Sequence, residues 1–393
     1  MNKTYCFFSA RYLPYLGGVE RYTYNLANEL ILAGNKVIIV TSHIGKELAY
    51  EKKENVEIFR LPSLSLLKGR FPVIRYNRET KKYIKALKEK TIDFVIVNTR
   101  FYLMSYVGAR FAHKNKISAI VIEHGTGHFT VNNRFFDSLG HIYEHFISII
   151  LKRNVKDYYG VSLECNKWLK HFKITAKGVL YNAINIEQII NLYEKRNQDI
   201  EKKIEYKSSD IVITFTGRLI KEKGVCKLLA AFKAIKEKFP DLKLCIAGDG
   251  NLYNEIVLEK EHGIYVLGKL SFENVVGLLK LSDIFCLPTD YPEGLPTSIL
   301  EAVACKCYVI TSAMGGAKEL ILDSTYGTVL QNNSVGELEK KLVEIISNRE
   351  RREKAVKKSY EKICSEFTWK RTADKIIEIF EKNGGKDRLK NVE

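Results

Sequence analysis

The most informative stretch of the chain is Thr289-Asp-Tyr-Pro-Glu-Gly-Leu-Pro-Thr-Ser-Ile-Leu-Glu-Ala302. An apolar run, Ile284-Phe-Cys-Leu287, comes just before it and is typical of a buried strand. From Ser298 onward the pattern is typical of a helix, and the residues between contain the glycine and prolines of a tight turn. The stretch therefore predicts a strand, a turn and a helix N-terminus in succession.

This predicted turn suits an anionic ligand that carries hydroxyl groups. The backbone amides of residues 294–298 would point at phosphate oxygens from the positive end of the helix. Glu301, one turn into the helix, is placed to accept hydrogen bonds from two neighbouring hydroxyls of a ribose, and Glu293 is placed to do the same for a sugar. Acidic residues also occur at ordinary helix starts, so this stretch alone leaves both interpretations open.

A second turn of the same kind lies upstream, at Phe215-Thr-Gly-Arg-Leu-Ile-Lys-Glu-Lys-Gly224. It follows the β-branched run Ile211-Val-Ile-Thr214, so it too leads from a strand towards a helix. Arg218 and Lys223 place two cations on this turn, which suits a diphosphate.

A third glycine turn lies near the N-terminus, between a strand at residues 5–9 and an amphipathic helix at residues 22–33. A further strand at residues 37–41 completes a βαβ unit with parallel strands. Gly17 and Gly18 lack a Cβ, so the backbone can approach a ligand closely there. A glycine pair also occurs in simple turns, and by itself it does not distinguish a ligand-binding turn from an ordinary one.

These three turns, in this order, resemble the signatures of the retaining glycosyltransferases of family four: a glycine-rich turn, Arg-x4-Lys-Gly and Glu-x7-Glu. The resemblance covers essentially the whole chain and implies the α/β GT-B fold, in which two Rossmann-like doubly wound domains face each other across a cleft. It implies an acceptor-binding domain at residues 1–190, a nucleotide-sugar-binding domain at residues 191–365, and a C-terminal helix at residues 366–393 that crosses back to the N-terminal domain. The length of 393 residues suits two such domains.

The resemblance also implies which residues act. His124 follows a strand at residues 117–122, a position where open α/β sheets bind ligands. A lone histidine is more often structural. Relatives, however, carry a histidine here that touches the donor sugar. His128 fits a loop position better than an acceptor contact. The implied catalytic residues are His124, Arg218, Lys223 and Glu293. The implied donor-binding residues are Gly17, Gly18, Gly217, Arg218, Lys223, Lys269, Glu293, Gly294, Leu295, Pro296, Thr297 and Glu301.

The expected reaction is transfer of a sugar from a nucleotide-diphosphate sugar, with UDP-sugars as the expected donors, to a saccharide or lipid-linked acceptor. Arg218 and Lys223 would stabilise the negative charge that grows on the leaving diphosphate. The sequence contains no Asp-x-Asp, so we expect a metal-independent reaction, no metal ligands and no cofactor. Retention of configuration follows from the resemblance, and Glu293 is expected to position the donor.

Charge is concentrated in the N-terminal half. Residues 1–200 carry 31 Lys/Arg and 17 Asp/Glu, a net charge of 31 − 17 = +14 out of +17 for the chain. Within residues 62–90, cations alternate with apolar and aromatic side chains, a pattern that fits an anionic membrane surface. Basic helix faces are also common on solvated surfaces. We expect membrane contact here, and a cell-surface polysaccharide precursor as acceptor.

The sequence shows neither a signal-peptide pattern nor an apolar run of membrane-spanning length. Eight scattered cysteines without a CxxC pair are typical of a reducing compartment. We therefore expect a cytoplasmic protein, peripheral on the inner face of the membrane. Two alternatives stay open: another GT-B nucleotide-sugar enzyme, such as an epimerase, and a nucleic-acid-binding protein. Against the second, the sequence lacks the aromatic residues on basic strands that are typical of a nucleic-acid-binding module. We therefore expect no nucleic-acid partner.

Overall fold

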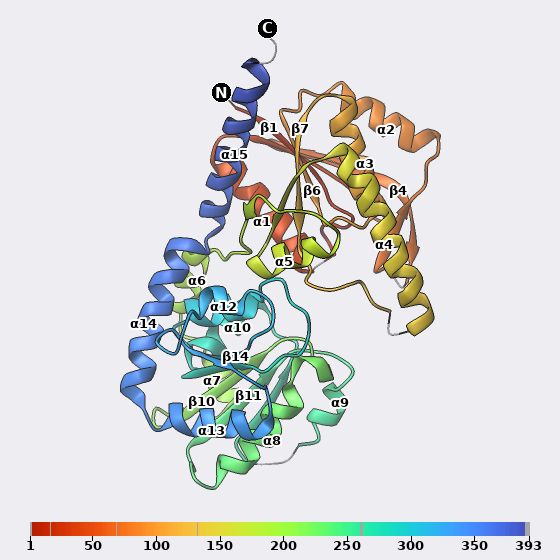
Figure 1. Ribbon diagram of the computed structural model, residues 1–393. Helices are drawn as coiled ribbons and strands as arrows, with labels where there is room; N and C mark the ends of the chain where they lie inside the picture. The colour runs from red at the N-terminus through yellow and green to blue at the C-terminus, as the bar shows by residue number, and fades with distance from the viewer. Residues whose placement is uncertain (1, 16, 68, 132, 260–261, 390–393) are drawn as a thin grey trace. The chain divides into compact units, whose positions relative to one another are not determined.

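The computed structural model describes residues 2–15, 17–67, 69–131, 133–259 and 262–389, with side chains described to residue 382. Lys68, part of the basic segment singled out above, lies outside these ranges. The chain divides into two compact units (Figure 1). Unit 1 contains Met1–Asn182 and Trp369–Glu393, and unit 2 contains Ala183–Thr368.

Unit 1 is built on a mixed sheet. Its strands are β1 (Thr4–Phe8), β2 (Lys36–His43), β3 (Tyr50–Lys53), β4 (Val56–Leu66), β5 (Phe71–Ile74), β6 (Phe94–Asn98), β7 (Ser118–Glu123), β8 (Asp157–Gly160) and β9 (Gly178–Val179). Its helices are α1 (Gly18–Leu32), α2 (Arg78–Lys88), α3 (Leu103–Lys114), α4 (Arg134–Asn154), α5 (Leu163–His171) and α15 (Trp369–Leu389).

The strands of unit 1 lie in the order β3-β4-β2-β1-β6-β7-β8-β9, with β5 paired to β4. From β4 to β8 all neighbouring pairs are parallel. Taken in chain order, these strands follow the 3-2-1-4-5-6 arrangement of a doubly wound Rossmann sheet. The order reverses between β1 and β6, and this is where such sheets bind ligands.

Helices cover both faces of this sheet. Successive residues of a strand point to opposite faces, and on β1 the ring of Phe8 lies 5.7 Å from Phe111 of α3 while Tyr5 lies 6.0 Å from Phe380 of α15. The C-terminal helix is therefore part of the core of unit 1. It is also held by Trp369, whose ring lies 5.1 Å from Tyr22 of α1.

Unit 2 is built on a parallel sheet. Its strands are β10 (Ile211–Thr216), β11 (Leu242–Ala247), β12 (Ile264–Gly268), β13 (Ile284–Leu287), β14 (Tyr308–Ser312) and β15 (Thr328–Leu330). Its helices are α6 (Ile186–Tyr193), α7 (Gln198–Lys203), the short 3-10 helix η1 (Lys221–Lys223), α8 (Val225–Lys236), α9 (Tyr253–Ile256), α10 (Phe272–Lys280), α11 (Thr297–Ala304), α12 (Ala317–Leu320), α13 (Val335–Ile346) and α14 (Arg349–Glu366).

The strand order of unit 2 is β12-β11-β10-β13-β14-β15, and all pairs are parallel. This is again the 3-2-1-4-5-6 order, with its reversal between β10 and β13. The turns that follow β10 and β13 therefore leave the sheet side by side. These are the two turns that carry Arg218, Lys223 and Glu293.

One expectation of local structure was wrong, since helix α1 begins at Gly18 rather than residue 22. Helix α4 begins at Arg134, because Asn133 caps it by accepting hydrogen bonds from the amides of Phe135 and Phe136. In the basic segment, β4 and β5 pair as an antiparallel hairpin. Within the described ranges, no helix is both long and apolar enough to cross a bilayer.

Candidate functional site

The turns after β10 and β13 are joined by backbone hydrogen bonds. The carbonyl oxygen of Glu222 accepts from the Thr289 hydroxyl at 3.1 Å and from the amides of Asp290 at 2.7 Å and Tyr291 at 3.0 Å. Three donors on one carbonyl fix the two turns to each other at the carboxyl edge of the sheet. The two motifs, about 70 residues apart in sequence, thus form one structure.

Gly224 is required for this contact. Its φ angle of 78° lies in the left-handed region, and a Cβ at this position would overlap the carbonyl group of Pro288. Only glycine meets both conditions without strain. The glycine of the Lys-Gly motif therefore allows the turn after β10 to pack against the end of β13.

The side chains of Lys223 and Glu293 form an ion pair across the two turns. Both are largely shielded, with 12% of the Lys223 side chain and 17% of the Glu293 side chain exposed. The exposed Arg218 guanidinium lies 4.9 Å from the Tyr291 ring, and the Lys223 ammonium lies 5.2 Å from the same ring. Tyr291, to which the sequence analysis assigned no role, thus holds both cations at one place.

The two cations affect each other. Burial, followed by the nearby Arg218 guanidinium, lowers the pKa of Lys223 to about 8, while the Glu293 carboxylate favours the charged form. Two positive charges this close repel each other, and a nearby anion offsets that repulsion. Glu293 supplies that negative charge in this structure, and a bound diphosphate would supply more.

Helix α11 starts where the turn after β13 ends. Pro296 precedes its first residue, Thr297, and Glu301 lies one turn further along, half-buried. The carbonyl of Gly294 accepts a hydrogen bond from the amide of Gly316 at 2.7 Å, which ties this turn to the one after β14. Leu295 and Pro296 are buried, so their side chains belong to the packing of this turn.

Gly217 and Lys269 lie at the same edge of the sheet. The amide of Gly217 donates to Ala247 at 3.0 Å, and the amide of Gly248 donates to Gly268 at 2.8 Å. Lys269 follows β12 directly and is exposed. Because β11 separates β12 from β10, Lys269 lies further along the edge than Arg218.

In unit 1, His124 follows β7 and is held from two sides. Its Nε2 lies 3.0 Å from Oδ1 of Asn98 at the end of β6, and its ring lies edge-on to Tyr22 at 4.7 Å. Asn98 also donates to the Thr23 hydroxyl of α1 at 2.8 Å. Burial lowers the pKa of His124 to about 3, so the imidazole is neutral near pH 7 and Nε2 donates its hydrogen to Asn98.

Gly17 and Gly18 open helix α1, with Gly17 in the N-cap position. Glu20, in the first turn of the helix, folds its carboxylate back over Gly17, where a Cβ would meet it. Burial raises the pKa of Glu20, and hydrogen bonds from the backbone amides of Glu20 and Gly17 oppose that rise. In this structure the N-terminus of α1 is thus occupied by a carboxylate of the chain itself.

A buried ion cluster that sequence reasoning missed lies beside His124. The guanidinium of Arg100, 1% exposed, lies 3.2 Å from a carboxylate oxygen of Glu123 and 2.9 Å from one of Glu144. Glu123 in turn accepts from the amides of His124 at 3.1 Å and Gly125 at 3.2 Å. The cluster therefore fixes the backbone on which His124 is carried. The one signal of it in the sequence is that Arg100 comes two residues after β6.

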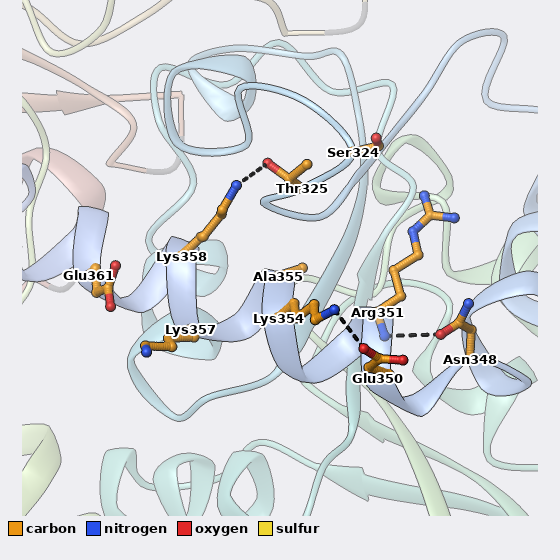
Figure 2. Close-up of a pocket in the computed structure, with 10 residues that line it drawn as sticks. All are labelled: Ser324, Thr325, Asn348, Glu350, Arg351, Lys354, Ala355, Lys357, Lys358 and Glu361. Atoms are coloured by element: carbon orange, nitrogen blue, oxygen red, sulfur yellow. Dashed lines mark hydrogen bonds and ion pairs between the residues drawn. The ribbon is translucent and has the colours of Figure 1, made fainter.

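A pocket of about 690 Å³ lies away from these residues, on helix α14 (Figure 2). Two of the polar contacts in it join Lys354 to Glu350 and Lys358 to the Thr325 hydroxyl. None of the residues singled out by the motifs lines it. In unit 2 the structure thus brings together Arg218, Lys223 and Glu293, while the glycine turn and His124 belong to unit 1.

Comparison with known families matches the two halves of the chain separately. The model described as Glycosyltransferase Family 4 matches residues 16–188, and the model described as Glycosyl transferases group 1 matches residues 196–362. Together the matched segments cover most of the chain and all the predicted site residues.

Individual proteins are similar over different lengths. An uncharacterised glycosyltransferase of Methanocaldococcus jannaschii is 26% identical over 396 residues, which covers 95% of this chain and 97% of the relative. A GDP-mannose-dependent phosphatidylinositol monomannoside mannosyltransferase of Corynebacterium glutamicum is 24% identical over 51% of this chain and 55% of its own. The crystal structure of HepE from Anabaena in complex with UDP has a TM-score of 0.74 at 18% identity, covering 97% of this chain and 100% of HepE.

Proposed function

The chain belongs to the glycosyltransferases of family four and group 1, which have the GT-B fold, and we propose that it is a retaining, metal-independent enzyme that uses a UDP-sugar. The observation that carries this proposal is the joined pair of turns in unit 2. There Arg218 and Lys223 lie with Glu293 at the point where the strand order reverses. That position in a doubly wound sheet is where a nucleotide is expected.

In the proposed reaction the diphosphate of the donor binds to Arg218 and Lys223. The ion pair between Lys223 and Glu293 then exchanges partners, because the diphosphate takes over the lysine and leaves the carboxylate to accept hydrogen bonds from sugar hydroxyls. As the bond between the anomeric carbon and the diphosphate breaks, an acceptor hydroxyl bonds to that carbon and its proton passes to the leaving diphosphate. Negative charge grows on the diphosphate in the transition state, and the two cations stabilise it more than they stabilise the ground state.

We assign the remaining donor contacts by the same reasoning. The backbone amides of Gly294, Leu295 and Thr297 at the start of α11 are proposed to bind phosphate oxygens. Glu301 is proposed to bind the ribose hydroxyls, and Lys269 the region of the base. For unit 1, we assign His124 to the transferred sugar as a neutral hydrogen-bonding group, and Gly17 and Gly18 to the diphosphate.

Metal independence is proposed because the chain supplies its own cations. Metal-dependent transferases often hold a divalent ion through Asp-x-Asp, which the sequence lacks. Two charges clustered on Tyr291 are able to neutralise the leaving group in its place. Chelation is therefore expected to leave the rate unchanged.

The choice of UDP rests on similarity to HepE, whose complex contains UDP, whereas the Corynebacterium glutamicum relative uses GDP-mannose. A donor panel decides between them. The purified full chain, in EDTA, would be incubated with UDP-, GDP- and ADP-sugars while nucleoside diphosphate release is measured. We expect release from a UDP-sugar and its loss in Arg218→Ala and Glu293→Gln.

Glu222→Gln is the matched control, since Glu222 lies in the same site but contributes its carbonyl, and its side chain is exposed. Its rate should stay near that of the unmodified chain. Release that persists in Glu293→Gln would contradict the assigned role. A folded chain that neither releases nor binds any nucleotide would overturn the proposal as a whole.

We further propose that unit 1 docks on an anionic membrane surface. Docking would place the enzyme on the cytoplasmic face of the membrane. The membrane would also supply a lipid-linked acceptor for cell-surface polysaccharide synthesis. Within residues 62–90, Leu64, Leu66 and Tyr76 are exposed among the cations. Helix α4 lies beside the β4–β5 hairpin, since the rings of Tyr143 and Phe71 are 5.8 Å apart. One stripe of α4 exposes large apolar side chains at Phe135, Phe136, Leu139, Ile142, Phe146 and Ile149.

An apolar stripe next to a basic segment is the arrangement that binds anionic lipid. The test is co-sedimentation with vesicles of anionic or zwitterionic lipid. Ile142→Glu/Phe146→Glu should lose binding to the anionic vesicles, whereas Leu258→Glu, at a 70% exposed leucine of unit 2, should not. Equal binding of both variants would contradict docking through α4.

A further inference from the structure

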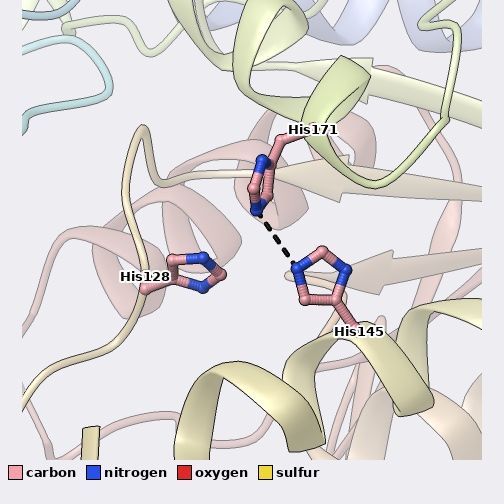
Figure 3. A group of neighbouring side chains, drawn as sticks. All are labelled: His128, His145 and His171. Carbon is pink, nitrogen blue, oxygen red and sulfur yellow. Dashed lines mark hydrogen bonds between the residues drawn. The ribbon is translucent and has the colours of Figure 1, made fainter. Parts of the chain in front are cut away.

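Three histidines of unit 1 turn their rings towards one another (Figure 3). His128 lies in the segment between β7 and α4, His145 on α4 and His171 at the end of α5. One ring nitrogen from each lies within 4.8 Å of the others, and the Nε2 atoms of His145 and His171 are 3.1 Å apart. Three elements thus contribute one imidazole each to a common point.

These spacings suit a transition-metal ion. A zinc ion bound tetrahedrally to imidazole, with Zn–N of about 2.0–2.1 Å, separates its ligand nitrogens by roughly 3.3 Å. The His145–His171 separation is already close to that value, and His128 needs a shift of up to about 1.5 Å. Imidazole is a preferred ligand for Zn²⁺, and also for copper, iron and nickel.

The orientation of His128 is fixed by a carboxylate. Its Nδ1 lies 3.1 Å from Glu144, which accepts the Nδ1 hydrogen and leaves the lone pair on Nε2 available. Metal-binding histidines almost always donate the hydrogen of their other nitrogen to a carboxylate, a backbone carbonyl or a water. Arg100 contributes one positive charge to this region, but Glu123 and Glu144 are two carboxylates against it, so the charge balance beside the histidines does not exclude a cation.

Aromatic packing holds the other rings. The ring of His171 stacks on Trp168 at 4.9 Å with an interplanar angle of 8°, and His145 lies 4.8 Å from Phe172. His141, one turn before His145 on α4, stacks face-on against His128 at 3.9 Å and does not direct a nitrogen to the same point as the three. Three ligands rather than four therefore define the site.

We propose that His128, His145 and His171 bind a divalent transition-metal ion, zinc foremost, with a fourth position open to water or to a ligand group. The bound ion links the segment after β7, helix α4 and helix α5. This site is separate from the donor chemistry of unit 2 and does not depend on the proposed transferase function. It would stabilise the packing of α4 against α5 and the segment after β7, without taking part in the transfer itself.

The experiment uses the full chain without an affinity tag, with the two exposed cysteines replaced as Cys226→Ser/Cys364→Ser so that thiolates do not compete for metal. After removal of metal with EDTA, Zn²⁺ binding is measured by calorimetry and Co²⁺ binding by visible absorption. We expect one ion per chain, a cobalt spectrum of nitrogen and oxygen ligation, and a higher melting temperature with Zn²⁺.

His145→Ala and His171→Ala should weaken Zn²⁺ binding by about 100-fold or more. His171 is exposed and His145 half-buried, so both variants are expected to fold, which circular dichroism would check. His113→Ala, on α3 outside the cluster, is the control and should bind Zn²⁺ as before. No saturable binding by the unmodified cluster, or equal binding by the His171→Ala variant, would overturn the proposal, whichever nucleotide the chain uses.

Discussion

The two units share one strand order but present different electrostatics at the edge where that order reverses. In unit 2 the turns carry two cations, Arg218 and Lys223, against one carboxylate, Glu293. In unit 1 the corresponding edge carries a neutral histidine, His124, and a carboxylate, Glu20, folded over the helix N-terminus.

The difference shows that the doubly wound sheet provides a place for a ligand without determining its charge. The residues added after each strand do that. The cations of unit 2 suit a diphosphate, whereas the neutral, hydrogen-bonding imidazole of His124 in unit 1 suits hydroxyl groups of a sugar or acceptor. Changes at each edge should therefore affect different steps.

The largest expected effect is that of Lys223→Ala. Removal of the buried cation should lower kcat by about 100- to 1000-fold, as the loss of one group that stabilises a developing anion does. Nucleoside diphosphate release in steady state measures it. Lys221→Ala is the control, because Lys221 lies on the same 3-10 turn but is exposed. An equal loss in both variants would mean that general positive charge, rather than this position, matters.

Gly224→Ala tests the geometry beneath those charges. Because φ is 78° and a Cβ would overlap the Pro288 carbonyl, we expect the local stability of unit 2 to fall by about 2–4 kcal/mol. Hydrogen exchange of the β10 and β13 amides measures this. Gly336→Ala, in α13 with open space around the glycine, should instead stabilise by about 0.5–1 kcal/mol. Unchanged exchange in Gly224→Ala would show that the turns are not as tightly joined as described.

In unit 1, His124→Ala should lower kcat by about 10- to 100-fold and leave the Kd for UDP unchanged. The reason is that the proposed diphosphate cations lie in unit 2, while His124 is assigned to the sugar. Tyr22→Phe removes only a hydroxyl that donates to the Leu180 carbonyl at 3.0 Å and serves as the control. A weaker Kd for UDP in His124→Ala would remove the distinction between the two edges.

The smallest expected effect is on pH dependence. The pKa of Lys223 is lowered to about 8, so the side chain loses its proton, and with it its charge, as pH rises through that value. The Kd for UDP should therefore rise by up to about tenfold per pH unit above about pH 8. Calorimetry at increasing pH measures it. In Lys223→Arg, whose guanidinium stays charged, the dependence should disappear; if it persists, another group is responsible.

The sequence predicted the parts of the fold in which local pattern and burial agree. The apolar run at residues 284–287 is β13, and the helix expected after it is α11. The contact between Lys223 and Glu293 is not visible in either motif alone. It depends on β10 and β13 being neighbours, which followed from the family resemblance rather than from spacing.

Other features did not follow from local pattern. The first turns of α4 do not follow from the local pattern, because Phe135 and Phe136 are exposed, 69% and 60%, and so do not show the periodicity of a helix packed on a core. Arg100 was missed because its burial depends on Glu123 and Glu144, which approach it only in the folded chain. The roles of the individual site residues remain predictions.

Helix α15 has a consequence for how the protein is made. Synthesis on the ribosome proceeds from the N-terminus, so the first 182 residues of unit 1 emerge well before Trp369 and Phe380, which complete its core. All of unit 2 is translated in between, and it has every strand of its sheet before α15 appears. The N-terminal sheet therefore emerges with part of one face not yet covered by α15, and apolar surface exposed in this way during synthesis favours aggregation.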